Sequence, residues 1–112
     1  MSLADKKCIP CRGGVSALTL DEAKRLLVEL NDWTLVGDKR LQRAIELGNF
    51  AESLKLANQV GALAEEEGHH PDLLVRWGQL RIEIWTHKVN GLTESDFILA
   101  SKIDRLLEQA PV

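Results

Sequence analysis

The chain has 112 residues, of which 45% are hydrophobic and 28% are charged, the balance of an ordinary globular protein. This length fits one domain that can bury a core without disulfides or a structural metal. The net charge of −3 disfavours attraction to nucleic acid or anionic lipid, and no apolar run approaches the about 20 residues that cross a bilayer. No apolar segment follows the opening residues, so we expect a cytoplasmic protein without a secretory signal, a membrane partner or a nucleic-acid partner.

Residues 1–18 are rich in Gly, Pro, Cys and Lys, and we expect them to form an irregular leader before a single domain over residues 19–112. The leader contains Cys8 and Cys11 as Cys-Ile-Pro-Cys. A redox motif of this spacing needs a preceding strand and a following helix N-terminus, and neither context is present. We therefore expect free thiols in a reducing cytosol, with a zinc site shared with histidines as the alternative.

The next segment predicts a helix followed by a β-hairpin. Thr19 and Glu22 have the spacing of a capping box, and leucines at helical spacing predict a helix over residues 20–31. A short β-type run at 33–36 is followed by a glycine-containing turn. Apolar and polar residues then alternate over 40–47, as in a half-buried strand that pairs with the first run.

A second helix is predicted over residues 50–67, with Asn49 as its N-cap and Gly68 at its C-terminal end. Several residues of its apolar stripe are small, and a glycine inside a helix costs about 1 kcal/mol relative to alanine. We therefore expect another element, in this domain or in a partner subunit, to approach the helix closely. The expected stripe consists of Phe50, Leu54, Ala57, Gly61 and Ala64, with Val60 and Leu63 beside it.

The last third predicts a second hairpin and a third helix. Strands are expected at 73–77 and 79–87, and Thr93 and Asp96 have the spacing of a second capping box before a helix that runs to about residue 107. The order is then α-β-β-α-β-β-α. Paired hairpins with intervening helices predict an α+β fold of two layers, in which three helices cover one face of a four-stranded antiparallel sheet.

All three histidines of the chain, His69, His70 and His87, lie within nineteen residues. The first two follow the end of the second helix, and the third is expected at the end of the last strand. Histidine suits proton transfer near neutral pH because its unperturbed pKa is about 6.5. Their clustering predicts an acid–base site, although a histidine near a helix C-terminus is also favoured by the helix dipole.

Other interpretations of these residues stay open on spacing alone. Three histidines can hold catalytic zinc, but adjacent ligands coordinate a metal poorly and no usual zinc-binding spacing is present. Asp96 can act simply as a helix cap, and Glu65 can be an ordinary charge at a solvated helix end.

The full pattern resembles the signature of the pterin-4a-carbinolamine dehydratases over about residues 19–107. The matching positions are Glu65, His69, His70, Pro71, Trp77, His87 and Asp96. The resemblance implies dehydration of a 4a-hydroxytetrahydropterin, such as 4a-hydroxytetrahydrobiopterin, to the quinonoid dihydropterin. It also implies recycling of a tetrahydropterin, no metal or cofactor, and a homodimer or homotetramer.

Loss of water from a carbinolamine needs one proton delivered to the departing hydroxyl and one removed from the neighbouring ring nitrogen. We hypothesise that His69 and His87 share these roles, without assigning either, and that His70 binds or orients the pterin. Thr86 and Glu65 are candidate additional substrate contacts, and Asp96 supports the geometry of the site. The alternatives are a non-catalytic dimerisation or transcription-cofactor module, as some animal members of the family provide, and a zinc-binding hydrolase-type site.

Overall fold

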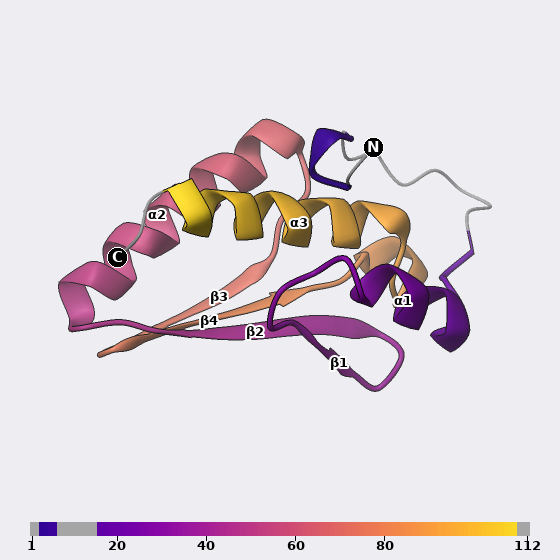
Figure 1. Ribbon diagram of the computed structural model, residues 1–112, viewed down its shortest axis with the longest axis horizontal. Coiled ribbons are helices and arrows are strands. Elements are labelled where there is room, and N and C mark those ends of the chain that lie inside the picture. Colours follow the sequence, from indigo (N-terminus) through magenta and orange to yellow (C-terminus); the bar gives the residue numbers. More distant parts are fainter. Residues whose placement is uncertain (1–2, 7–15, 110–112) are drawn as a thin grey trace.

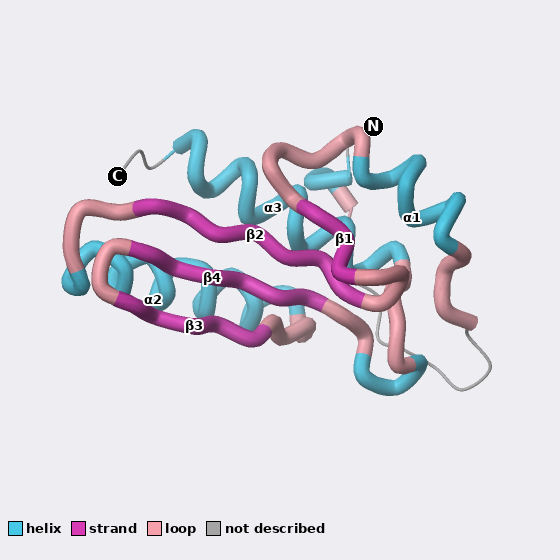
Figure 2. The backbone as a smooth tube through the Cα atoms, turned by 90° about the horizontal axis from the view of Figure 1, so that it is seen from below, coloured by secondary structure: helices cyan, strands magenta, loops and turns pink. Residues whose placement is uncertain are grey.

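The computed structural model describes residues 3–6 and 16–109, and its architecture confirms the predicted α+β fold (Figure 1). The four strands form one antiparallel sheet in the order β1-β2-β4-β3, and the three helices lie on one face of it (Figure 2). The elements are α1 (Leu20–Leu27), β1 (Thr34–Val36), β2 (Arg40–Glu46), α2 (Phe50–Glu67), β3 (Asp72–Arg76), β4 (Gln79–Ile84) and α3 (Glu94–Gln109). No helix in these described ranges is long and apolar enough to span a membrane.

The core forms where the central strands meet the helices. In β4 the residues alternate as predicted, and Leu80, Ile82 and Ile84 are all fully buried. The register places Leu41 of β2 opposite Ile84, which continues the apolar row across the sheet. Phe97 of α3 is also completely buried and belongs to the same core cluster, so α3 contributes to this core.

Helix α1 is shorter than the sequence predicted. The capping box at its start is present, but the helix ends at Leu27 rather than near residue 31. Residues 28–30 continue as tight turns, and the backbone N–H of Asn31 donates to a carboxylate oxygen of Asp104 on α3 (2.9 Å). A tertiary hydrogen bond therefore ends this segment, which a local pattern cannot reveal.

Helix α2 has the predicted bounds, but its buried stripe differs from the predicted one. Phe50 and Leu54 are 48% and 46% exposed. The space beside Gly61 is open within the described residues, so the close approach expected there is not found in this chain. The helix carries apolar residues on more than one face, so periodicity alone did not decide which face is inside. The residues that face the core are Ser53, Leu56, Ala57, Val60 and Ala64.

Two further segments depart from expectation. Strand β4 ends at Ile84, so the prediction that His87 ends the last strand is wrong: the chain forms a 3-10 turn, η2 (His87–Val89). Thr86 and Gly91 pair across the base of this turn. Within the segment expected to be irregular, Leu3–Asp5 form another 3-10 turn, in which Leu3 is buried in the core.

Candidate active site

The end of α2 determines where His69 and His70 lie. Gly68 adopts the left-handed conformation (φ 67°) and donates its backbone N–H to carbonyls of the last helical turn. The backbone N–H of His69 donates to the carbonyl of Ala64 (3.2 Å). A glycine adopts this conformation without steric cost, so the chain turns sharply as it leaves the helix. The two histidines therefore start a new direction of the chain, as the sequence predicted for this helix end.

Asp96 is the centre of the polar network beside His69. Its side chain is fully buried, and Oδ1 lies 2.5 Å from Nε2 of His69. Oδ2 accepts hydrogen bonds from the Thr86 hydroxyl (2.8 Å) and from the backbone N–H of Thr93 (2.8 Å). A buried carboxylate is costly unless its oxygens are satisfied, and here each oxygen has a partner.

The contact with Thr93 is only half of the predicted capping box. Asp96 does reach back to the Thr93 backbone, but the Thr93 hydroxyl lies 2.9 Å from the Thr86 hydroxyl. Thr93 thereby joins the start of α3 to the end of β4. Sequence reasoning recognised Thr93 as a cap and missed this second role, for which the sequence carries no separate signal.

The geometry at Asp96 determines which nitrogen of His69 is free for chemistry. When Nε2 carries its proton and donates to Asp96, Nδ1 of the neutral ring is an acceptor. A buried carboxylate in this position also stabilises the imidazolium that forms when Nδ1 takes a proton. His69 itself remains partly accessible, with 16% of its side chain exposed. The pair can therefore act as a supported general base.

His87 lies next to this network. It directly follows Thr86, whose hydroxyl donates to the same carboxylate that His69 contacts. Its side chain lies against the indole of Trp85, with the ring centroids 4.4 Å apart and the planes inclined by 38°. His87 is exposed, as a group that exchanges protons with a bound molecule must be. The structure thus brings His87 and His69 to the same end of β4.

His70 and Glu65 form a separate pair at the surface. Nε2 of His70 contacts a carboxylate oxygen of Glu65, one turn earlier on α2, and the two side chains are 61% and 76% exposed. Neither residue contacts Asp96 within the hydrogen bonds described. Among the predicted site residues, His69 and Thr86 therefore contact the buried Asp96, whereas His70 and Glu65 form an exposed pair and His87 is exposed against Trp85.

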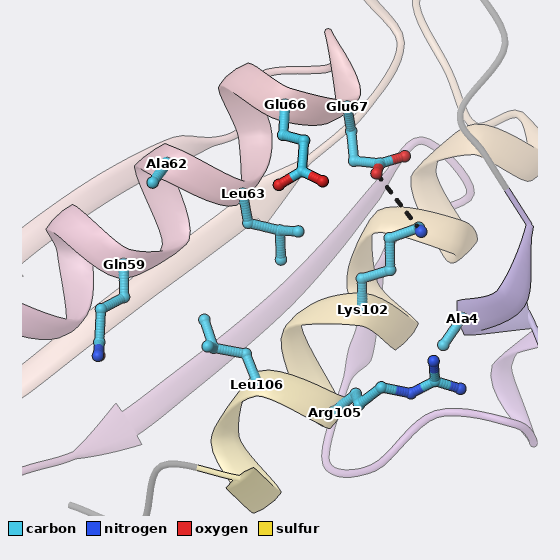
Figure 3. A pocket seen from close by; sticks show the side chains of 9 residues that line it. All are labelled: Ala4, Gln59, Ala62, Leu63, Glu66, Glu67, Lys102, Arg105 and Leu106. Atoms are coloured by element: carbon cyan, nitrogen blue, oxygen red, sulfur yellow. Dashed lines mark ion pairs between the residues drawn. The ribbon is translucent and has the colours of Figure 1, made fainter.

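Two other features of the chain bear on alternative sites. The described residues contain no group of three or more His, Cys, Asp or Glu side chains that could hold a metal ion, and Cys8 and Cys11 lie outside the described residues. A cavity of about 470 Å³ between α2 and α3 is lined by Leu63 and Leu106 and by the ion pair of Glu67 with Lys102 (3.4 Å), and by none of the histidines (Figure 3).

Comparison with known proteins identifies a family whose model covers most of the chain. The model of the family described as pterin 4 alpha carbinolamine dehydratase matches residues 16–106. The chain belongs to this family. The match contains every predicted site residue, from Glu65 to Asp96.

Curated relatives cover nearly the whole chain. A protein of Rubrobacter xylanophilus is 49% identical over 93% of this chain and 97% of its own length. One of Rickettsia bellii is 53% identical over 94% of each chain. Both are named for pterin-4-alpha-carbinolamine dehydratase activity, which is the activity of a hydro-lyase, so the family places this chain among enzymes.

A solved structure supports the fold. The crystal structure described as a transcriptional coactivator/pterin dehydratase from Brucella melitensis matches with a TM-score of 0.74 and 26% sequence identity. The match covers 81% of this chain and 98% of that chain. The arrangement of three helices on a four-stranded antiparallel sheet therefore matches the fold of this solved pterin dehydratase structure.

Proposed function

We propose that this protein removes water from a 4a-hydroxytetrahydropterin, such as 4a-hydroxytetrahydrobiopterin, and releases the quinonoid dihydropterin. The observation that carries the proposal is the contact of His69 with the buried Asp96, because it supplies a supported base beside a second histidine. Family membership supports the same reaction. In this role the enzyme acts in the cytoplasm after an aromatic amino acid hydroxylase, and its product returns to the tetrahydropterin pool through a reductase.

The reaction needs two proton transfers. The C4a–O bond breaks as the hydroxyl receives a proton and leaves as water, while the proton on the neighbouring ring nitrogen N5 is removed and the C4a–N5 double bond forms. Asp96 favours the base role for His69, which leaves proton delivery to the exposed His87. Each acid or base contributes about 10²- to 10⁴-fold to the rate. No metal or other cofactor enters these steps.

His70 is assigned to binding rather than to proton transfer. It lies beside His69 in the chain, but its partner is the exposed carboxylate of Glu65 instead of Asp96. This pair can offer the pterin a hydrogen-bond donor and an acceptor at the rim of the site. Thr86 contributes through its hydrogen bond to Asp96 and remains a candidate substrate contact.

The test follows dehydration of the carbinolamine by absorbance in four proteins: the unsubstituted chain, His69→Ala, His87→Ala and His70→Ala. Removal of His69 or His87 should lower kcat by about 10²- to 10⁴-fold, whereas removal of His70 should mainly raise KM. Circular dichroism of each variant checks that the fold is kept. Full activity in both His69→Ala and His87→Ala would show that the assignment is wrong.

A second candidate function is an interaction module, and one observation favours it. Phe50 and Leu54 leave large apolar side chains exposed on the outer face of α2, a feature typical of contact surfaces. The same face supports assembly of the enzyme as a homodimer or homotetramer. Sedimentation of the unsubstituted protein and of Leu54→Glu tests self-assembly through this face. An oligomer that becomes a monomer in Leu54→Glu would support it, and a monomer in both proteins would contradict it.

A further inference from the structure

The side chain of Trp85 contacts both His87 and Arg40, and the three side chains form a stack. Its indole contacts the His87 imidazole, with ring centroids 4.4 Å apart. The guanidinium carbon of Arg40 lies over the same indole, 4.1 Å from its centroid. Arg40 begins β2, one residue before Leu41, and Trp85 directly follows Ile84; because Leu41 pairs with Ile84, Arg40 and Trp85 both lie just beyond the last pair of β2 with β4. A cation over the face of a tryptophan ring is attracted by the ring electrons.

Arg40 is held in turn by charged and polar groups of the sheet. Its Nη1 donates to Oε1 of Glu83 (3.0 Å), and the amide nitrogen of Gln42 donates to Oε2 of the same carboxylate (3.0 Å). Glu83 lies two residues before Trp85 on β4, on the same side of the strand. The bond to Glu83 therefore holds the guanidinium over the indole, and the bond from Gln42 holds the Glu83 carboxylate.

The position of this stack matters because His87 lies outside the regular sheet. It begins the turn η2, whose residues are exposed or only half-buried. His69 is oriented by Asp96, whereas His87 meets the sheet through the indole of Trp85. An imidazole in an exposed turn samples several rotamers unless a neighbour restricts it. The Trp85 ring supplies that restriction.

We propose that Trp85 is a positioning residue for His87, and that Arg40 holds the Trp85 ring in place. This inference rests on the proposed function, in which His87 delivers a proton to the substrate. It adds that Arg40 and Glu83 of the sheet and Trp85 directly after β4, rather than the residues around Asp96, determine the orientation of that group. A small misplacement of a catalytic group costs up to about 10²-fold in rate, so the stack affects kcat rather than binding.

The test combines NMR with kinetics on Trp85→Leu and Trp85→Phe. In the unsubstituted protein the ring current of the indole should displace the ring-proton resonances of His87, and Trp85→Leu should abolish this displacement. The same variant should lower kcat about tenfold with little change in KM, less than the loss on removing His87 itself. Trp85→Phe keeps an aromatic ring at this position and should retain most of kcat.

Matched controls come from the same sheet. Arg40→Met should lower kcat in the same direction as Trp85→Leu, whereas Arg76→Met, an exposed arginine of β3, should leave kcat unchanged. Trp77→Leu, at the opposite end of β4 from His87, should leave the His87 resonances unchanged. Arg76→Met therefore controls for loss of a surface cation, and Trp77→Leu controls for loss of a tryptophan.

Three outcomes would overturn the inference. They are unchanged His87 resonances in Trp85→Leu, unchanged kcat in that variant, and an effect confined to KM, which would make Trp85 a platform for the pterin. The NMR arm needs no turnover, so failure of the two proposals can be told apart. A protein that does not dehydrate the carbinolamine, but whose His87 resonances respond to Trp85→Leu, would contradict the proposed function and leave the contact itself in place.

Discussion

Asp96 shows how one side chain serves both the fold and the proposed chemistry. It accepts hydrogen bonds from the start of α3 and from the end of β4 while its other oxygen contacts His69. A carboxylate can accept all of these bonds at once, because it has two oxygens and carries no proton to donate. Replacement of Asp96 therefore affects stability and rate together.

Asp96→Asn should lower both the stability of the protein and the rate of the reaction, and the sizes of the two changes can be measured separately. The amide places an NH₂ group where an oxygen accepted a hydrogen bond, which should lower the free energy of unfolding by about 1–3 kcal/mol. It also removes the charge that supports His69, so kcat should fall by about 10²- to 10⁴-fold. Chemical denaturation and the absorbance assay measure the two quantities. Asp38→Asn, in the exposed turn between β1 and β2, is the matched control, and equal effects in both variants would contradict the role given to Asp96.

At this scale the sequence offered the candidate residues but not the contacts that connect them. The positions from Glu65 to Asp96 follow from spacing and from the family resemblance. The pairing of His69 with Asp96, rather than with another histidine, depends on how β4 and α3 pack, which spacing alone does not contain. The strand expected over residues 79–87 contains Trp85 but gives it no role, although it lies two residues before His87, on the same side of an extended chain.

Among the elements, α2 connects the fold most directly to the site. Asn49 caps its start, with its side chain accepting from the backbone N–H of Glu52 (2.9 Å), and Gly68 ends it. The sequence predicted both ends because capping depends on local residues. The buried face was not predicted correctly, because Phe50 and Leu54 are apolar as well, and only tertiary packing decides which face is inside.

Alanine substitutions of Gly61, inside α2, and of Gly68, at its C-terminal end, should change the stability of the protein in opposite directions. Gly68 has a φ of 67°, which costs an alanine about 1–2 kcal/mol, so Gly68→Ala should lower stability by that amount and also lower kcat by shifting His69. Gly61 lies within the helix, and a Cβ there meets open space. Gly61→Ala should therefore raise stability by up to about 1 kcal/mol.

Thermal and urea unfolding of both glycine variants measure this contrast. Both substitutions add one methyl group, so a difference between their effects on stability reports the backbone conformation at each position. Stabilisation by Gly68→Ala would contradict the conformation given to the end of α2. Destabilisation by Gly61→Ala would show instead that another chain packs closely against this face of the helix.

Across the whole molecule, Asp104 connects α3 to the segment that ends α1 and to the sheet. It accepts hydrogen bonds from the backbone of Asn31 (2.9 Å), from the indole N–H of Trp33 (2.7 Å) and from Arg43 of β2 (2.6 Å). Burial raises the pKa of Asp104, and this effect outweighs the contacts with Asn31, Trp33 and Arg43, which lower it. Asp104 therefore links segments that are far apart in the chain, and its contribution to the free energy of unfolding depends on pH.

The sign of this dependence follows from the raised pKa. The folded protein holds the Asp104 proton more tightly than the unfolded chain does. The contribution of this proton to the free energy of unfolding is therefore complete below the ordinary pKa of 3.8 and is lost as pH rises through the raised pKa. Unfolding of the original protein and of Asp104→Asn, followed across this acidic range, gives a difference in free energy. That difference should decrease with rising pH and then become level. A difference that increases with pH would contradict this account.

The overall architecture was predictable because hydrophobic periodicity, turn residues and capping residues all point to the same order of elements. The departures occur where distant parts of the chain meet. Asn31 is held by Asp104, seventy-three residues later, and Leu3 is buried in a core whose main strands and helices lie far along the chain. Contacts of this kind leave no periodic signal in the sequence.

The central claim is that this fold catalyses loss of water from a 4a-hydroxytetrahydropterin. The most direct measurement is the initial rate at which the purified unsubstituted protein converts the carbinolamine to the quinonoid dihydropterin, compared with the spontaneous rate in the same buffer. Two proton-transfer groups predict an acceleration of about 10⁴-fold or more. A rate equal to the spontaneous one, in a folded protein, would contradict the account.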